Sequence, residues 1–254
     1  MQGETPLTPS LRAQKKTVVV TGASRGLGLA ICKQLLQENY FVVAISRTLS
    51  NELSHLCTEQ QQSITYVPYD LADLDGIHTL CKSITETYGR PYGLVNNAAV
   101  GFDGVLATMH NSEINTLLNI NVQAPILLSK YLSRSMMLNR TGRIINISSI
   151  IASTGFSGLS VYAASKAALE GFTRSLSREV GKAGITVNCV APGYMQTEMT
   201  SSLQGDKLES VKRRSPLGRL ASPADAASAV LYLMSEQARS ITGTIMTVDA
   251  GSTA

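Results

Sequence analysis

The sequence has little of what metal centres, disulfide frameworks and nucleic-acid surfaces require. Its four cysteines form no C-x-x-C pair, and its three histidines belong to no cluster with ligand spacing, which argues against a catalytic metal and against disulfides. Charged residues make up only 16% of the chain, and the net charge of +4 includes no run of lysines or arginines, so no nucleic-acid partner is expected. No apolar run approaches the roughly 20 residues that span a membrane.

The composition is that of a globular protein that stays in a reducing compartment. Hydrophobic residues make up 44% of the 254 positions, which is enough for a sizeable core. The cysteines are expected to behave as small buried hydrophobes: Cys32, Cys57, Cys81 and Cys189. Residues 1–16 are polar and contain two prolines, so we expect a flexible tail before a single domain over residues 17–254. The expected location is the cytoplasm, with the mitochondrial matrix as the alternative if the tail is a transit peptide.

A glycine-rich turn follows the first apolar strand. Residues 17–20 are a β-branched run, and a helical stretch is expected over residues 29–39. Between them lies T-G-A-S-R-G-L-G, in which Gly22 permits a tight turn, Gly26 lets the backbone approach a pyrophosphate, and Gly28 allows close packing of helix on strand. Such a turn could also be purely structural, but its place between strand and helix indicates a phosphate-binding loop.

The end of the second predicted strand indicates which dinucleotide this loop binds. Residues 41–46 form that strand, and its last residue is Ser46, where a fold that selects NAD carries an acid for the ribose 2′-hydroxyl. Without that carboxylate there is no repulsion of a 2′-phosphate, and Arg47 and Arg25 offer guanidinium donors for it. The sequence therefore predicts NADP rather than NAD. The alternative is that both arginines are only solvated loop residues.

The remaining pattern alternates short apolar strands with amphipathic helices. Further strands are expected over residues 64–69, 94–95, 142–148, 186–190 and 244–248, and helices over residues 79–88, 111–138, 160–182 and 222–235. This alternation predicts an α/β fold: a single doubly wound Rossmann domain with about seven parallel strands and helices on both faces. Residues 194–215 are too long for a plain connection and are expected to form a lid or a disordered loop.

The chemistry is expected where the fifth strand meets the next long helix. Ser149 follows the strand, and Tyr162 and Lys166 stand four residues apart, so that phenol and ammonium share one helix face. A fixed cation favours the phenolate and would lower the tyrosine pKa from its ordinary value of about 10. A serine hydroxyl beside such a tyrosine can hold a substrate oxygen while a proton is exchanged, which suits interconversion of a carbonyl and an alcohol. By itself, Tyr-x-x-x-Lys is often an accident of an exposed helix.

One polar residue lies awkwardly within the helical region of residues 111–138. Asn121 is surrounded by apolar residues, and an asparagine side chain that competes for backbone hydrogen bonds often bends a helix. Asn121 is therefore expected to weaken the helix, and the sequence shows no structural reason for an asparagine there.

Taken in order, these motifs resemble the short-chain dehydrogenase/reductase family over residues 16–251. The resemblance implies that the phosphates are held by Gly22, Ser24, Arg25, Gly26, Leu27 and Gly28. It implies that Asp70 and Leu71 flank the adenine, that Asn97 and Ala98 line the nicotinamide side, and that Pro192, Gly193 and Thr197 hold the carboxamide. It implies a catalytic quartet of Asn121, Ser149, Tyr162 and Lys166, in which Asn121 holds a water that resupplies the proton through Lys166, which also binds the cofactor ribose.

Within that family the residues from Gly171 to Thr200 are most similar to β-ketoacyl-[acyl-carrier-protein] reductases. The resemblance implies NADPH-dependent reduction of a β-ketoacyl thioester, linked to acyl carrier protein or coenzyme A, as one step of fatty acid biosynthesis. The alternatives are a reductase or alcohol dehydrogenase of another small ketone, and a dinucleotide-binding subunit without activity. An NAD-dependent dehydrogenase would want an acid at position 46, and a subunit without activity would typically lose Tyr162 or Lys166.

The resemblance also implies a homotetramer, paired through the helices of residues 111–138 and 160–182. Apolar residues on more faces than one sheet contact needs support this pairing: Leu128, Leu132, Leu169, Phe172 and Leu176. For a carrier protein, the implied docking position beside the active-site mouth matches Arg140, with Arg143 close by. Ala183 occupies the second docking position, which leaves Lys182, Arg178 or Arg174 as substitutes.

Overall fold

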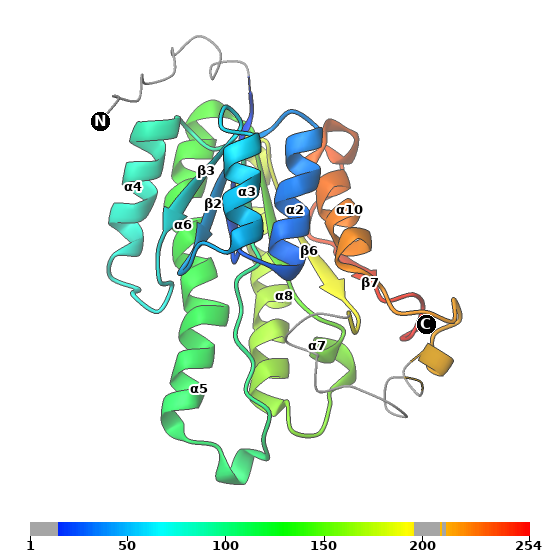
Figure 1. The fold of residues 1–254 in the computed structure, drawn as a ribbon. Coiled ribbons are helices and arrows are strands. Elements are labelled where there is room, and N and C mark those ends of the chain that lie inside the picture. The colour runs from blue at the N-terminus through cyan, green and yellow to red at the C-terminus, as the bar shows by residue number, and fades with distance from the viewer. Residues whose placement is uncertain (1–14, 196–208, 210–211) are drawn as a thin grey trace.

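The computed structural model describes residues 15–195, 209 and 212–254, and predictions on other residues lie outside it. Seven parallel strands form one sheet in the order β3-β2-β1-β4-β5-β6-β7 (Figure 1). The strands are β1 (Thr17–Thr21), β2 (Phe41–Ser46), β3 (Ile64–Pro68), β4 (Gly93–Asn96), β5 (Gly142–Ile147), β6 (Ile185–Pro192) and β7 (Ile245–Val248). The predicted doubly wound sheet of seven parallel strands is thus confirmed.

The strand order reverses direction at β1. Chain order runs outward from β1 through β2 to β3, and then returns to β4 on the other side of β1. The crevice beyond the carboxyl ends of β1 and β4 is therefore the topological switch point, where doubly wound sheets bind their ligands.

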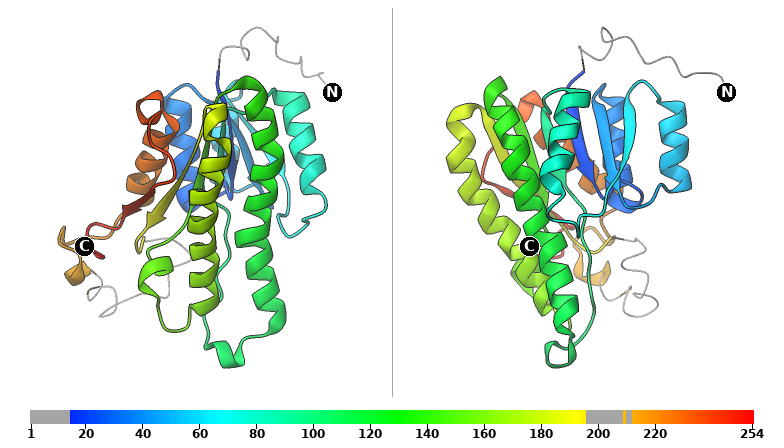
Figure 2. Two further views of the ribbon diagram at one scale, coloured as in Figure 1. Left: turned by 180° about the vertical axis from the view of Figure 1, so that it is seen from behind. Right: turned by 90° about the vertical axis from the view of Figure 1, so that its left-hand side faces the viewer.

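Both faces of the sheet are covered by helices. Successive side chains of a strand point to opposite faces, so each strand contributes to two separate cores. Val18 and Val20 of β1 face one core cluster, whereas Val19 faces the other. Figure 2 shows the helices on the two sides of the sheet. The first cluster is covered by α2 (Gly26–Gln37), α3 (Asn51–Glu59) and α10 (Pro223–Met234), and the second by α4 (Ile77–Tyr88), α6 (Ala124–Asn139) and α8 (Ser160–Val180).

Helix α3 and a short α-helix after Ser149 were not predicted. Helix α3 begins after Ser50, whose side chain accepts a hydrogen bond from Leu53 N at 3.1 Å, and it buries Leu53 as its one fully covered residue. The short α7 (Ile151–Thr154) begins two residues after Ser149, with Ile150 as its N-cap. Both are short and mostly polar on the outside, so their apolar periodicity is weak.

The long helical region of residues 111–138 is one continuous rod with a defect in its middle. It consists of α5 (Asn111–Leu118), a π-helical turn η2 (Asn119–Gln123) and α6. The π turn contains Asn121, and Pro125 lies in the first turn of α6, where a missing N–H is tolerated. The predicted irregularity at Asn121 is therefore present.

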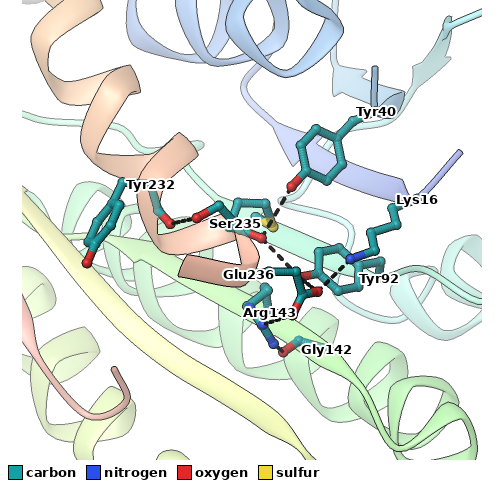
Figure 3. A network of polar contacts seen from close by, with 9 residues as sticks. Lys16, Tyr40, Tyr92, Gly142, Arg143, Tyr232, Ser235 and Glu236 are labelled. Atoms are coloured by element: carbon teal, nitrogen blue, oxygen red, sulfur yellow. Dashed lines mark hydrogen bonds and ion pairs between the residues drawn. The ribbon is translucent and has the colours of Figure 1, made fainter. Parts of the chain in front are cut away.

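A cluster of charged and aromatic side chains lies at the amino ends of the strands, opposite the switch point (Figure 3). Glu236 pairs with Lys16 at 2.6 Å and with Arg143 at 3.5 Å, and it accepts a hydrogen bond from the Tyr92 hydroxyl at 3.2 Å. The Lys16 ammonium also lies 4.2 Å from the centroid of the Tyr92 ring. This cluster ties the starts of β1 and β5 to the end of α10, and it anchors Lys16, which the sequence had placed in the tail.

The residues offered in support of a tetramer are already covered within the protomer. Leu128, Leu132, Leu169 and Leu176 are all less than 10% exposed, and Phe172 packs against the same core. The sequence argument from these side chains was therefore wrong, because α6 and α8 pack against the sheet and against each other. Exposed apolar residues on the rod formed by α5 and α6 are Leu118, Met137 and Leu138. The tetramer itself stays a prediction.

The four cysteines are free, and three of them are buried as predicted, whereas Cys57 is half-buried. Over the described part of the chain, no helix combines the length and the apolar character needed to cross a membrane.

Candidate active site

The glycine loop has no room for side chains at two of its positions. Gly22 (φ +65°) and Gly26 (φ +53°) adopt the left-handed conformation that other residues rarely take. A Cβ at Gly22 would lie 2.9 Å from Cα of Ala98, and one at Gly28 would lie 2.1 Å from the carbonyl oxygen of Gly22. The loop therefore presents bare backbone at the amino end of α2, which fits the pyrophosphate of a dinucleotide. Of the other predicted loop residues, Leu27 is buried, Ser24 is half-buried and Arg25 is exposed.

A hydrogen-bonded clasp joins this loop to the end of β4. The Thr21 hydroxyl accepts from the backbone N–H groups of Asn97 and Ala98, each at 3.0 Å. The Asn97 side-chain amide donates to the carbonyl oxygens of Thr21 at 2.9 Å and Gly22 at 3.2 Å. The amide predicted to line the nicotinamide side thus fixes the two strand ends at the switch point.

The predicted selector for the 2′-phosphate lies at the carboxyl end of β2. Ser46 is buried, and its hydroxyl donates to the carbonyl oxygen of Thr48 at 2.9 Å. The serine side chain is thus directed into its own turn. Position 46 therefore has no carboxylate that would repel a 2′-phosphate. Arg47 and Arg25 are both exposed at the same edge of the sheet.

Residues predicted around the rest of a dinucleotide also lie along this edge. Asp70 accepts from Ala72 N at 3.0 Å in the turn after β3, and Leu71 beside it is buried. Pro192 ends β6, and Gly193 donates from its N–H to the carbonyl oxygen of Val248 at 2.9 Å. Thr197 lies outside the described residues.

The catalytic candidates converge where β5 meets α8. Ser149 is two residues beyond the end of β5, and Tyr162 and Lys166 face it from the first turns of α8. Lys166 is 2% exposed, and its ammonium nitrogen donates to the carbonyl oxygen of Ile147 at 2.8 Å. That nitrogen lies 5.6 Å from the centroid of the Tyr162 ring. The predicted sharing of one helix face is thus realised.

The electrostatics of this group differ from the sequence expectation. Burial raises the pKa of Tyr162, and a hydrogen bond with Ser149 partly offsets that rise. Burial also lowers the pKa of Lys166 to about 8. The predicted lowering of the tyrosine pKa is therefore wrong, because desolvation penalises the charged phenolate and raises the pKa. A phenol that keeps its proton and is hydrogen-bonded to Ser149 is suited to act as a proton donor.

Asn121 forms hydrogen bonds with another segment rather than with its own helix. Its side chain pairs with Val100 in both directions, accepting from the N–H and donating to the carbonyl oxygen at 2.8 Å each. It also donates to the Ser165 hydroxyl at 3.2 Å, and Ser165 donates to the carbonyl oxygen of Tyr162 at 2.7 Å. The fully buried Asn121 therefore connects the chain after β4 to the helix that carries Tyr162 and Lys166.

Sequence reasoning missed two groups that hold these residues in place. Ser165 is one, and its position one residue before Lys166 was the available signal. The other is a buried chain in which Asn96 donates to Asn146 at 2.8 Å and Asn146 donates to Thr173 at 2.8 Å. This chain joins β4, β5 and α8 beneath the site, and polar residues within apolar strands were its signal.

The two predicted docking arginines have different surroundings. Arg140 is exposed in the turn before β5, but Arg143 is 3% exposed and belongs to the cluster with Glu236. Both lie at the amino end of β5, whereas Ser149 lies beyond its carboxyl end. Within one protomer β5 thus separates Arg140 and Arg143 from the active-site mouth, and docking of a carrier protein at Arg140 stays a prediction.

No group of three or more metal-ligating side chains occurs among residues 15–195, 209 and 212–254. The chemistry that the described groups support is proton exchange at a hydroxyl or carbonyl oxygen beside a dinucleotide cradle.

Comparisons with known proteins agree with this arrangement. A family model described as Enoyl-(Acyl carrier protein) reductase matches residues 22–253. The 3-oxoacyl-[acyl-carrier-protein] reductase FabG of Vibrio harveyi is 37% identical over 243 residues, covering 95% of this chain and 98% of the relative. That of Haemophilus influenzae is 38% identical over 240 residues, covering 94% and 98%.

Two solved structures show the same fold in complexes. A protein named "putative NAD(P) dependent gluconate 5-dehydrogenase", from Beutenbergia cavernae and with bound NADP, has a TM-score of 0.88 and 32% identity, covering 93% of this chain and 96% of that one. ElxO with NADP bound has a TM-score of 0.87 and 29% identity, covering 94% and 99%. With its glycine cradle, its Ser149, Tyr162 and Lys166 arrangement and these relatives, the chain belongs to the short-chain dehydrogenase/reductase family, as an NAD(P)-dependent oxidoreductase.

Proposed function

We propose that this enzyme uses NADPH to reduce the keto group of a β-ketoacyl thioester to the hydroxyl. The observation that carries the proposal is the grouping of Ser149, Tyr162 and Lys166 at the end of β5, beside the cradle formed by the glycine loop. Support for the substrate comes from relatives that are 37–38% identical over nearly the whole chain and are named 3-oxoacyl-[acyl-carrier-protein] reductases.

The cofactor is NADP(H), and it supplies the hydride that reduces the carbonyl carbon. Backbone at Gly22, Gly26 and Gly28 would hold the pyrophosphate, since the loop's tight path leaves no room for a Cβ at Gly22 or Gly28 and Gly26 has a left-handed φ. Arg25 and Arg47 are the donors for the 2′-phosphate, and position 46 has no carboxylate to repel it.

In the proposed mechanism Ser149 and Tyr162 act on the substrate oxygen. Ser149 donates a hydrogen bond to the carbonyl oxygen and so positions it. The Tyr162 phenol, whose raised pKa keeps it protonated, gives its proton to that oxygen as negative charge develops. The residual phenolate is stabilised by the Lys166 ammonium on the same helix face.

Lys166 and Asn121 support this proton transfer from below. Lys166 is held by the Ile147 carbonyl oxygen and has further N–H donors for the cofactor ribose. Asn121 fixes the backbone at Val100 and, through Ser165, the turn of α8 that carries Tyr162. In this proposal a backbone group of Asn121, in the π turn, binds a water that resupplies the proton through Lys166.

The test is a panel of β-ketoacyl thioesters, sugar-derived ketones, steroids and small ketones, each assayed with NADPH and NADH. The proposal expects the highest kcat/KM for a β-ketoacyl thioester with NADPH. A sugar acid such as 5-ketogluconate is the informative competitor, because a protein of that type shares the fold at 32% identity. A clear preference for it would refute the thioester assignment and leave the oxidoreductase mechanism in place.

Delivery of the substrate by a carrier protein has a geometric condition. The turn of Arg140 packs against the turn before β6, since a Cβ at Gly184 would lie 2.3 Å from the Arg140 carbonyl oxygen. Arg140 and Lys182 therefore share the amino-terminal end of the sheet. The six residues of β5 separate that end from Ser149 by about 20 Å. A carrier protein that docks on Arg140 would therefore serve the active site of a second protomer.

This docking can be tested with Arg140→Glu on two forms of one acyl group, linked to the carrier protein and to a small thiol. Loss of activity with the carrier-linked form alone supports docking. Equal rates on both forms, before and after the substitution, refute it and leave a reductase of free thioesters.

A further inference from the structure

Tyr194 contributes an aromatic side chain to the carboxyl edge of the sheet that the proposed mechanism does not use. It follows the Pro192–Gly193 pair that ends β6. Its ring meets the ring of Phe156, from the chain between α7 and α8, edge to face at a centroid distance of 6.1 Å and an angle of 69°. Two aromatic rings from different loops thus pack together beside the catalytic group.

Backbone contacts place these loops around the catalytic tyrosine. The N–H of Ile150, next to Ser149, donates to the carbonyl oxygen of Pro192 at 3.0 Å, which sets the start of the Tyr194 segment beside Ser149. The N–H of Gly104 donates to the carbonyl oxygen of Gly158 at 3.0 Å.

The chain before Gly104 reaches the catalytic group itself. A Cβ at Gly101 would lie 3.7 Å from the Tyr162 ring. The segments that carry Tyr162, Phe156 and Tyr194 are therefore joined by contacts around the catalytic group.

The hydroxyl of Tyr194 is buried without a hydrogen-bond partner among the described residues. A buried hydroxyl left in this state costs roughly 1–3 kcal/mol, so it is rarely retained without a use. Burial raises the pKa of this phenol, Arg214 lowers it and Asp103 raises it, so the group keeps its proton at neutral pH. It is a hydrogen-bond donor.

Apolar side chains are exposed on the segments beside this donor, and Asp103 and Arg214 are the charged groups near it. Phe156 is 55% exposed, and the chain that follows Gly104 exposes Val105 and Leu106 by more than half. Large exposed apolar side chains beside a catalytic site are suited to the aliphatic part of a substrate. A hydrogen-bond donor beside such side chains could recognise an oxygen atom of a substrate that also has an aliphatic part.

We propose that Tyr194 is a specificity-determining residue whose hydroxyl donates a hydrogen bond to a substrate oxygen other than the one that is reduced. The site then favours ketones that carry a second oxygen acceptor close to the reacting carbonyl, as the thioester carbonyl of a β-ketoacyl thioester does. This inference rests on the proposed function, because it assumes that the reacting carbonyl binds at Ser149 and Tyr162.

The experiment compares wild-type enzyme, Tyr194→Phe and Tyr232→Phe on a β-ketoacyl thioester with saturating NADPH. Tyr194→Phe keeps the ring contact with Phe156 and removes only the hydroxyl. Tyr232 is a partly exposed tyrosine on α10 and serves as the matched control. For Tyr194→Phe we expect KM to rise about 3- to 10-fold with kcat within 2-fold of wild type, because a neutral hydrogen bond to the bound substrate is lost.

Thermal unfolding separates this role from a structural one. Removal of an unpartnered buried hydroxyl should leave Tm unchanged or raise it, and Tyr232→Phe should behave as wild type in both assays. An unchanged KM for Tyr194→Phe, or a fall in Tm together with kcat, overturns the inference.

The failure of the proposed function gives a different result. A wild-type enzyme that reduces another ketone but no β-ketoacyl thioester refutes the proposed function alone. The role of Tyr194 is then decided on a matched pair of accepted ketones with and without a second oxygen. It is overturned if Tyr194→Phe changes KM equally for both.

Discussion

The Lys166 ammonium donates to the carbonyl oxygen of Ile147, 2.8 Å away, and this bond ties the catalytic helix to the last residue of β5. The same strand end leads into Ser149, so one backbone segment positions both the lysine and the serine. Because Lys166 is almost fully buried, its positive charge lowers the free energy of unfolding, and the size of this effect depends on pH.

Lys166→Met should stabilise the protein at neutral pH and do so less in alkali. The folded-state pKa of Lys166 is lowered to about 8 from 10.5, so the unfolded chain binds more protons between these values. The destabilisation by Lys166 is thus complete below pH 8 and fades as pH rises toward 10.5. The gain from Lys166→Met should shrink by about 3 kcal/mol over that window. Urea unfolding at pH 7 and pH 10.5 measures it, with the exposed Lys33→Met as control. A gain independent of pH contradicts the assignment.

Cofactor preference should follow the residues at the end of β2. Ser46→Asp with Arg47→Leu should narrow or reverse the preference for NADPH over NADH. The substitutions add a repulsive carboxylate and remove a charge-assisted donor, and each such contact contributes about 1.5–3 kcal/mol. The ratio of kcat/KM for the two cofactors is the measurement. Arg90→Leu, at the other end of the sheet, should leave the ratio unchanged, and equal use of both cofactors by the wild type argues against the proposed selection.

Gly28→Ala should abolish cofactor binding, whereas Gly171→Ala should be harmless. A Cβ at Gly28 would lie 2.1 Å from the Gly22 carbonyl oxygen, so the phosphate loop must move. Gly171 lies within α8 with open space around it, and alanine there should stabilise the helix by about 0.5–1 kcal/mol. Titration with NADPH and thermal unfolding of both variants test this. Tight NADPH binding by Gly28→Ala would show that the loop is not the cradle.

The cluster of Arg143 and Glu236 should respond unequally to removal of its two charges. Glu236→Gln leaves the buried Arg143 guanidinium without its anion, so it should destabilise the fold. The effect should be about 1 kcal/mol, because the Glu236 side chain is 62% exposed and solvent screens the pair. Arg143→Met removes a buried charge and should be neutral or stabilising.

Low pH should reduce the contribution of the Arg143–Glu236 pair to the stability of the fold. Hydrogen bonding from Lys16, and more weakly the charges of Lys16 and Arg143, lower the pKa of Glu236. Its contribution is present above the ordinary glutamate pKa and is lost as pH falls through the lowered value. Urea unfolding of both variants at pH 7 and pH 3 follows this. A larger loss from Arg143→Met than from Glu236→Gln would contradict the assignment.

The sequence predicted the sheet well because its strands are buried on both faces. Continuous apolar runs such as Phe41–Ser46 leave no alternative element, and the glycines before α2 fix the first crossover. Helix α3 was missed because it buries little beyond Leu53, so its pattern is weak. Arg140 lies just before β5 as predicted, but the sequence did not show that the whole strand separates it from Ser149.

Site residues were predictable where their chemistry is unusual and not where their role is to position others. Asn121 stood out as a polar residue on an apolar helix, but its pairing with Val100 depends on a contact 21 residues away in the chain. The raised pKa of Tyr162 could not be foreseen, because burial and a nearby cation act in opposite directions and only the packing decides between them. Tyr194 begins the long segment that the sequence singled out, but its own role was not predictable, since an unpartnered hydroxyl is a property of the folded site.

The central claim is that Tyr162 gives the proton to the substrate oxygen, and Tyr162→Phe tests it most directly. Single-turnover reduction of a β-ketoacyl thioester should slow by about 10²–10⁴, because general acid catalysis is worth that much. NADPH binding, measured by fluorescence titration of the same preparation, should stay within about threefold of wild type, since the ring remains. A variant that keeps half of the wild-type rate, or one that loses NADPH binding together with activity, would contradict the account.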